Sequence, residues 1–212
     1  FFHTYFKNIV AKKPGLLRNY LGGSRFDFSA RAVISSITDP HRYDEVEVPW
    51  GVVLTIFRPM LVNKLVKKHG MMTNDVVGML LSHTGVYHPL IDQCLQEIIA
   101  ETKEGRYPVI LNRFPSLLQG SIQKVYIPRI KTDPKDLTLG VSILIVSAPN
   151  ADFDGDSCCL YLSLDEALAD LWYSLSPKFN ILGMDEPLKI NGNIKLPKPV
   201  IATVGAWLAE ES

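Results

Sequence analysis

The sequence predicts an α+β protein in which short strands build a barrel or sheet and a group of helices is inserted between them. Two observations lead to this expectation. Extended runs of aliphatic and β-branched residues recur on both sides of the chain's middle, whereas residues 58–105 repeat apolar side chains at helical spacing. In addition, 47% of the 212 residues are hydrophobic and 21% are charged, which is typical of a chain that folds around a buried core.

The first half of the chain predicts short strands followed by helices. Strands are expected at residues 31–34, 46–48 and 52–56. Helices are expected at residues 58–69, 75–83 and 90–102. Asn74 is the predicted N-cap of the second helix, because its side-chain oxygen can accept a hydrogen bond from an N–H of the first turn. Gly105 is expected to end the third helix.

The second half returns to strands and ends in loops. Strands are expected at residues 108–111, 122–130, 139–146 and 158–162, and a helix at residues 164–175. Glycines and prolines then predict a loop-rich end with a short helix. The expected organisation is a basic lead-in and start of the barrel at residues 1–31, a barrel domain at 32–175 with a helical insertion at about 58–105, and a C-terminal extension at 176–212.

Charge is balanced over the whole chain but not along it. The 22 basic and 22 acidic residues give a net charge of zero, which argues against a free-standing nucleic-acid binder. Residues 1–31 carry six basic side chains against one acid, residues 106–132 carry five and no acid, and residues 136–186 carry nine acids against Lys178. This pattern suits a polyanion and its metal ion, although charge alone favours the simpler explanation, solvated faces of mixed sign.

Several classes of protein are excluded by simple features. No window reaches the roughly 18 unbroken apolar residues of a membrane span, so no membrane partner is expected. The cysteines Cys94, Cys158 and Cys159 form no CxxC pair, which argues against a disulfide framework or a Cys-rich zinc site and favours a reducing, cytoplasmic compartment. The chain begins at Phe1 rather than Met, so we expect a segment of a longer protein.

The strongest chemical signal lies at residues 150–156, with the sequence NADFDGD. Asp152, Asp154 and Asp156 alternate, and in a straight strand they would share one face and repel each other. Gly155 permits a positive φ, so the chain can turn and aim all three carboxylates at one point. Such a group requires a hard dication, and oxygen-only ligands indicate Mg²⁺ or Ca²⁺.

The calcium alternative fails on spacing. An EF-hand loop counted from Asp152 needs Gly at its sixth place and Glu at its twelfth, where this chain has Ser157 and Ser163. Mg²⁺ usually takes phosphate oxygens from its substrate, so a three-carboxylate Mg²⁺ site indicates phosphoryl chemistry. An acidic surface turn is the simpler alternative, against which stand Ala151, Phe153 and the apolar strands on either side.

The acidic segment resembles the active-site signature of the largest, β′-type subunit of multi-subunit DNA-dependent RNA polymerases. The likeness continues in the same order over roughly residues 7–185. Residues 111–117, LNRFPSL, resemble that subunit's substrate-contacting motif, and residues 13–31 resemble the segment that holds the template strand. The compact form resembles the split largest subunits of giant bacteriophage polymerases. It departs from the family at Leu16, Ser24, Leu118 and Gln119, where basic residues or His are usual.

The resemblance implies a fold, a cofactor and site residues. The fold would be a double-psi β-barrel with flanking helices, in which the metal loop joins two strands. The catalytic residues that bind Mg²⁺ would be Asp152, Asp154 and Asp156, with a second ion arriving on the NTP. Arg113 would contact the ribose of the incoming nucleotide, and Asn150 would help to select its 2′-hydroxyl. The template phosphates would be contacted by Arg18, Arg25 and Arg31.

The implied activity is Mg²⁺-dependent nucleotidyl transfer from NTPs to the RNA 3′ end on a DNA template. Its partners would be a β-like second-largest subunit, other β′ segments, template DNA and nascent RNA, in the cytoplasm of a bacterium or of a phage-infected host. Two alternatives stay open: a non-catalytic, cation-binding barrel that serves as a scaffold, and an RNA-templated polymerase of the silencing type. Arg113 and Asn150 argue against the scaffold, because a structural metal needs neither.

Overall fold

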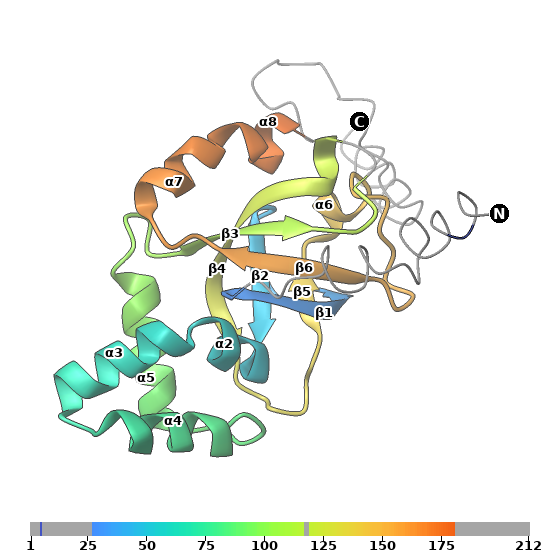
Figure 1. Cartoon of the computed structure of the whole chain (residues 1–212). Helices are drawn as coiled ribbons and strands as arrows, with labels where there is room; N and C mark the ends of the chain where they lie inside the picture. Colours follow the sequence, from blue (N-terminus) through green and yellow to red (C-terminus); the bar gives the residue numbers. More distant parts are fainter. Residues whose placement is uncertain (1–4, 6–26, 117–118, 181–212) are drawn as a thin grey trace, which may run out of the picture.

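Within the described residues, six strands form a closed barrel (Figure 1). The computed structural model describes residue 5, residues 27–116 and residues 119–180. The strands are β1 (Ser29–Ser36), β2 (Glu45–Pro49), β3 (Tyr107–Asn112), β4 (Ile122–Lys131), β5 (Leu139–Val141) and β6 (Ser157–Leu162). Their order around the barrel is β1-β5-β2-β4-β3-β6, and β6 pairs with β1 to close it. The expected α+β class and the barrel are therefore confirmed.

The pairing of the strands follows a two-fold pattern. β1 pairs with β5, and β2 with β4, in parallel, whereas the other four neighbouring pairs are antiparallel. Suppose that β1 is exchanged with β4, β2 with β5 and β3 with β6. Each parallel pair then falls on a parallel pair, and each antiparallel pair on an antiparallel pair. The two halves of the chain therefore contribute equivalent strands, and β3 and β6 occupy equivalent places side by side.

The interior of the barrel is filled by alternating apolar side chains. In β6 every second residue is buried, namely Cys158, Leu160 and Leu162. The same core takes Val46 and Val48 from β2, Val109 and Leu111 from β3, Val125 and Ile127 from β4, and Leu139 and Val141 from β5. Fully burying an aliphatic side chain of this size contributes roughly 1.5–3 kcal/mol. This core is therefore what holds the loops at the barrel ends in place.

Two short helices correct the predicted strands. The sequence predicts extended chain at residues 52–56 and at 143–146, but the structure has α2 (Trp50–Ile56) and α6 (Ile143–Val146) there. Both segments are aliphatic runs, in which periodicity does not separate a strand from a buried helix. α2 begins directly after β2, and one residue separates the end of β5 from α6. β2 and β5 are equivalent strands in the two-fold pattern. Position at the end of the barrel therefore outweighs local β propensity.

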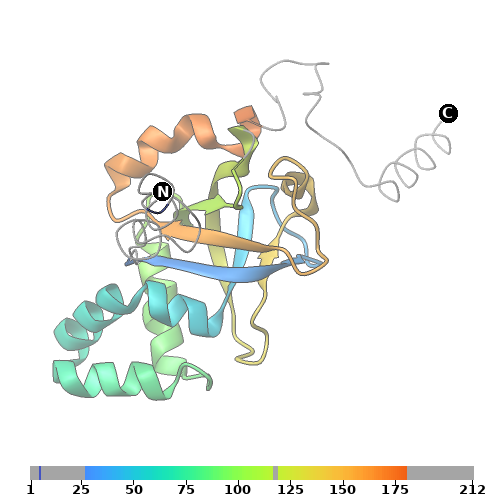
Figure 2. The same ribbon diagram turned by 45° about the vertical axis from the view of Figure 1, so that its right-hand side comes forward.

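Three longer helices lie between α2 and β3: α3 (Arg58–His69), α4 (Thr73–Ser82) and α5 (Pro89–Ala100). They match the predicted helices to within two residues and gather beside one end of the barrel in both views (Figures 1 and 2). The indole N–H of Trp50 donates to the main-chain oxygen of His83 at 2.8 Å, which joins α2 to the end of α4. The N-cap of α4 is Met72, so the cap predicted at Asn74 is wrong, because the helix begins before that residue.

The chain after β6 is helical where the helix at 164–175 is predicted and also at residues 177–180, inside the segment predicted as loop-rich; the rest of that segment, residues 181–212, lies outside the described residues. The chain after β6 forms α7 (Glu166–Leu171), the 3₁₀ turn η3 (Trp172–Leu175) and α8 (Pro177–Asn180), and a further 3₁₀ turn, η2 (Gln119–Ser121), precedes β4. Asp165 caps α7, since its side chain accepts from the N–H of Ala167 at 2.9 Å. Among the residues described, no helix has the length and apolarity that crossing a membrane requires.

Candidate catalytic site

The acidic loop, residues 150–156, begins in a turn that ends α6. Asn150 has a left-handed conformation with φ of 52°. Its N–H donates to the main-chain oxygen of Ser147 at 3.0 Å, and the N–H of Ala151 donates to that of Val146 at 3.1 Å. These bonds form a Schellman-type turn, in which Asn is tolerated better than most other non-glycine residues. Asn150 therefore shapes the loop in addition to being a candidate for substrate contact.

Asp156 ties the loop together at its other end. Gly155 has φ of 113°, so the positive φ predicted there is confirmed. The main-chain oxygen of Asp156 accepts from the N–H of Ile34 in β1 at 2.9 Å. Its side-chain Oδ2 accepts from the N–H of Asp152 at 3.0 Å. The carboxylate of Asp156 therefore spans the loop and holds the main chain of its first acidic residue.

The guanidinium of Arg113 binds the same carboxylate through two hydrogen bonds. Its Nε donates to Oδ2 of Asp156 at 3.0 Å and its Nη2 to Oδ1 at 3.1 Å. Bidentate, charge-assisted pairs of this kind are stronger than neutral hydrogen bonds. The side chains are 17% and 26% exposed, so water screens the pair only in part. With the N–H of Asp152, the guanidinium holds the pKa of Asp156 below its usual value.

The strand order explains why these residues meet. β6 lies between β1 and β3 and runs antiparallel to both, with Arg31 and Asn112 each opposite Cys159. Arg113 follows Asn112, so its side chain reaches the start of β6, where the acidic loop ends. On the other side of β6, Nε of Arg31 donates to Oγ of Ser157 at 2.7 Å. Arg31 in β1 and Arg113 directly after β3 therefore flank the end of the loop.

The loop has the donor chemistry of a hard-dication site, but its carboxylates are not gathered around one point. Asp152 and Asp154 are exposed, whereas Asp156 is bound to Arg113. In the parts of the chain that the structure describes, no three His, Cys, Asp or Glu side chains are placed to hold a metal ion together. The three-carboxylate Mg²⁺ site therefore stays a prediction. It requires the side chains of Asp152 and Asp154 to turn toward Asp156.

The remaining predicted residues are placed as follows. Arg31 is exposed on β1 beside the loop, whereas Arg18 and Arg25 lie outside the described residues. Cys158 fills the core as expected, and burial raises the pKa of its thiol to about 11, so it is a poor nucleophile and ligand at neutral pH. Cys159 is half-buried.

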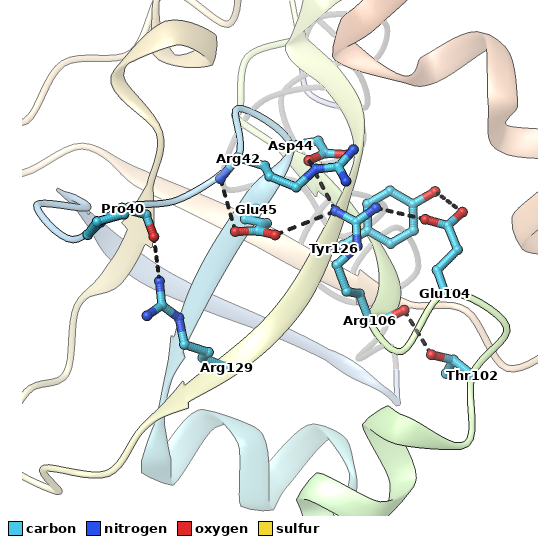
Figure 3. Close-up of polar contacts among 9 residues, drawn as sticks. All are labelled: Pro40, Arg42, Asp44, Glu45, Thr102, Glu104, Arg106, Tyr126 and Arg129. Atoms are coloured by element: carbon cyan, nitrogen blue, oxygen red, sulfur yellow. Dashed lines mark hydrogen bonds and ion pairs between the residues drawn. The ribbon is translucent and has the colours of Figure 1, made fainter.

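The basic stretch at residues 106–132 does not form an open cationic face. Arg106 is the centre of a partly buried network (Figure 3), in which it donates to Asp44 at 3.1 Å and to Glu104 at 2.7 Å and lies over the ring of Tyr126. The other basic residues of the stretch also have partners: Arg113 has Asp156, Lys124 has the Tyr126 ring, Arg129 has Glu47 and Lys131 has Asp136. The charge run in this stretch therefore reflects pairing within the fold, because the barrel brings acids from distant segments to it.

Sequence reasoning missed three features of the site: the Arg113–Asp156 pair, the left-handed Asn150 and the role of Ser157 as partner of Arg31. For Asn150 the signal was hidden, since Asn is a known C-terminal turn residue of helices but residues 139–146 are predicted to be extended. For the other two, the only signal was opposite or complementary chemistry at the ends of predicted strands. The strand order of the barrel is what brings them together.

Comparison with known proteins identifies the family. The family model for RNA polymerase Rpb1, domain 2, matches residues 23–170. The chain belongs to the family of the largest RNA polymerase subunit. This largest-subunit segment is 35% identical over 176 residues to DNA-directed RNA polymerase subunit beta′ of a Nitratiruptor species. It is 32% identical over 186 residues to the same subunit of Ureaplasma parvum serovar 3.

The match covers most of this segment but little of its relatives. It takes in 82% of the chain and 11% of the Nitratiruptor subunit, and 83% and 13% in the Ureaplasma case. The subunit of Aliarcobacter butzleri is 34% identical, again over 82% of the chain and 11% of its own length. The resemblance to a β′-type subunit is therefore confirmed, and the bacteriophage placement stays a prediction.

Proposed function

We propose that this chain supplies the catalytic segment of a multi-subunit DNA-dependent RNA polymerase, which transfers nucleotidyl groups from NTPs to the RNA 3′ end on a DNA template. The observation that carries the proposal is the meeting of Arg113 and Asp156. Arg113 belongs to the motif that resembles the substrate contact and Asp156 to the motif that resembles the metal loop. They bond to each other where β3 ends and β6 begins. The names of the relatives, all DNA-directed RNA polymerase subunits, support a DNA template.

We further propose that the barrel is of the double-psi type. Its support is the closed ring of six strands and the two-fold pairing pattern with its two parallel pairs. In this pattern the connection from β2 to β3, which contains α2 to α5, corresponds to the connection from β5 to β6, which contains α6 and the acidic loop. The acidic loop therefore lies in one of two equivalent connections, and the alternating carboxylates Asp152, Asp154 and Asp156 belong to that one.

The residues that would hold Mg²⁺ are Asp152, Asp154 and Asp156. Their fit rests on the donor set, three carboxylates within five positions on a loop turned by Gly155. When bound, the ion would help the RNA 3′-hydroxyl to become a nucleophile and offset charge at the phosphorus, with a second ion carried by the NTP. Asp152 and Asp154 are exposed and Asp156 is half-buried, so the chain itself supplies two solvated ligands and one fixed ligand.

The neighbouring polar residues would orient the nucleotide and the template. Arg113 offers a planar fork of donors beside the loop, which suits ribose oxygens. Asn150 is exposed at the start of the loop, and its amide can donate to or accept from a 2′-hydroxyl. Arg31 lies on the other side of β6 and would contact a template phosphate, together with Arg18 and Arg25.

The partners of the chain are part of the proposal. Because it spans 11% to 13% of its relatives, the rest of a working enzyme would come from a β-like subunit and from further β′ segments. Template DNA, nascent RNA and NTPs would bind in the assembled complex, in the cytoplasm of a bacterium or of a phage-infected host. A split bacteriophage subunit would have this segment on a chain of its own.

The test is the assembled enzyme carrying Asp154→Asn, with Asp170→Asn as matched control on α7. We expect Asp154→Asn to lower the rate of RNA extension by roughly a hundredfold or more, since even indirect partners of a metal site often contribute up to that factor. Subunit assembly, measured by co-purification, should be unchanged in both variants. Near-normal extension by Asp154→Asn would support the scaffold alternative instead.

A further inference from the structure

We infer that Arg113 and a divalent cation compete for the carboxylate of Asp156, so that cation binding releases the Arg113 guanidinium for the nucleotide. The inference rests on the proposed function, because it takes residues 150–156 as the metal loop. It adds a second task for Arg113, as a residue that sets how tightly the loop binds its ion. This task follows from the hydrogen bonds that the two side chains make.

Both oxygens of the Asp156 carboxylate are already in use. Oδ1 accepts from Nη2 of Arg113 at 3.1 Å. Oδ2 accepts both from Nε of Arg113 and from the N–H of Asp152, each at 3.0 Å. Oδ2, with two donors on it, has little lone-pair capacity left for a cation, whereas Oδ1, with one donor, keeps a single site. A dication and a guanidinium on one carboxylate also repel each other. Each partner therefore disfavours the other.

The balance of charge in the loop leads to the same expectation. Arg113 offsets one of three carboxylates placed within five positions, while Asp152 and Asp154 are exposed to water. Removing the guanidinium leaves the full negative charge for an ion to neutralise. A residue that merely held Asp156 in position for the metal would have the opposite effect, since its loss would weaken binding. The sign of the change in cation affinity therefore separates the two roles.

Competition also links the cation to the substrate. The two effects are reciprocal. The factor by which the Arg113–Asp156 pair lowers the affinity for the cation equals the factor by which the bound cation lowers the equilibrium constant of the pair. The main chain of Arg113 is held at the end of β3, where its N–H donates to the oxygen of Ser121 at 3.4 Å. A released guanidinium therefore stays beside the loop, where a ribose would lie. Metal loading would in this way prepare the nucleotide contact.

The experiment titrates the full chain with Mn²⁺, followed by the electron paramagnetic resonance signal of the free ion, and repeats it with Mg²⁺ in competition. The variants are Arg113→Gln, Arg113→Lys and Asp154→Asn. Arg129→Gln on β4 is the matched control, which removes a guanidinium bonded to Pro40 and Glu47. Thermal unfolding of each variant checks that the fold is kept.

We expect Arg113→Gln to bind Mn²⁺ roughly five- to a hundredfold more tightly than the unaltered chain, the usual range of linked binding. Arg113→Lys should lie between the two, because it keeps the charge but loses the fork. Arg129→Gln should stay within about twofold, since distant exposed charges are screened. In the unaltered chain, Mg²⁺ should shift the nuclear magnetic resonance signal of the Arg113 Nε–H and speed its exchange with water.

Two results would overturn the inference, and they differ from each other. If Arg113→Gln binds Mn²⁺ equally or more weakly while Asp154→Asn abolishes binding, the metal loop stands and Arg113 is a positioning residue. If neither the unaltered chain nor any variant binds Mn²⁺, and Mg²⁺ leaves the Nε–H signal unchanged, the loop is not a metal site on this chain. The inference and the metal proposal then fail together. The signal of the unaltered chain decides the matter even if Arg113→Gln does not fold.

Discussion

The N–H of Ala151 bonds to the main-chain oxygen of Val146 at 3.1 Å and thereby closes the turn in which Asn150 is left-handed. A substitution at Asn150 therefore changes two things, the side-chain amide and the backbone preference. Alanine loses the amide and is also strained in this conformation, by roughly 1–2 kcal/mol. Glycine loses the amide but accepts the conformation. The pair of variants separates substrate contact from loop shape.

The first prediction is that both Asn150→Gly and Asn150→Ala relax sugar selection in the assembled enzyme. A lost hydrogen bond of about 1 kcal/mol corresponds to roughly a fivefold gain for dNTPs relative to rNTPs. The measurement is the ratio of kcat/KM values for an rNTP and its dNTP. Only Asn150→Ala should also lower thermal stability. An unchanged ratio in Asn150→Gly would show that this amide does not read the 2′-hydroxyl.

The second prediction is that the chain alone does not extend RNA. The chain spans 11% to 13% of the length of its relatives, so most of the proposed enzyme would be missing. The basic residues at 106–132 are also already paired within the fold. An incomplete site loses the positioning and charge stabilisation that phosphoryl transfer depends on. The purified chain is incubated with Mg²⁺, NTPs and an RNA-primed DNA scaffold, with and without partner subunits. Extension by the chain alone that Asp152→Ala abolishes would contradict the proposal that partner subunits supply the rest of the working enzyme.

The third prediction concerns the network around Arg106. Its side chain is 13% exposed and that of Asp44 is 6% exposed, so Arg106→Met leaves the buried Asp44 carboxylate with one cation, Arg42, whose side chain is 61% exposed. A buried charge left with no partner typically lowers the free energy of unfolding by about 3–5 kcal/mol, and because Arg42 still pairs with Asp44 we expect a loss below about 3 kcal/mol. Urea unfolding measures it. The control, Arg129→Met, affects a pair that is 48% exposed on the arginine side and should change stability by about 1 kcal/mol or less.

A second variant tests the cause of that loss. Adding Asp44→Asn to Arg106→Met removes the buried charge that Arg106 balanced, so part of the lost stability should return. No recovery would mean that Arg106 acts through packing on Tyr126, over whose ring it lies at 4.2 Å, rather than through its ion pairs.

The fourth prediction is a pH dependence that arises between α3 and α5. The ammonium of Lys68, with that of Lys64, lowers the pKa of Glu97 from 4.5 to about 2. A carboxyl with a depressed pKa stabilises the fold fully above its unfolded pKa and loses this contribution as the pH falls toward the folded one. Glu97→Gln should therefore be less stable than the unaltered chain at neutral pH, and the difference should vanish between pH 4.5 and about pH 2.

The check is urea unfolding of both chains across that pH range. A gap for Glu97→Gln that stays constant with pH would show that the Lys64–Glu97–Lys68 contacts contribute nothing through charge, as many exposed pairs do.

The periodicity of the sequence determined the long helices and most strands. Residues 58–69 were predicted as a helix and form α3 over the same residues, because apolar spacing, Pro59 near the start and Gly70 after the end all act locally. The acidic loop was likewise visible, since alternating carboxylates around a glycine are a local pattern. The family, too, followed from short motifs in order.

Only the tertiary structure decided what the aliphatic runs at α2 and α6 become and which charges meet. A run of β-branched residues satisfies a strand or a buried helix equally, and the end of the barrel strand before it selects the helix. Arg113 and Asp156 are 43 positions apart, and their pairing depends on β3 lying beside β6 in the closed barrel. Local patterns fix the elements because their energies depend on near neighbours, whereas contacts across strands depend on the order in which the barrel closes.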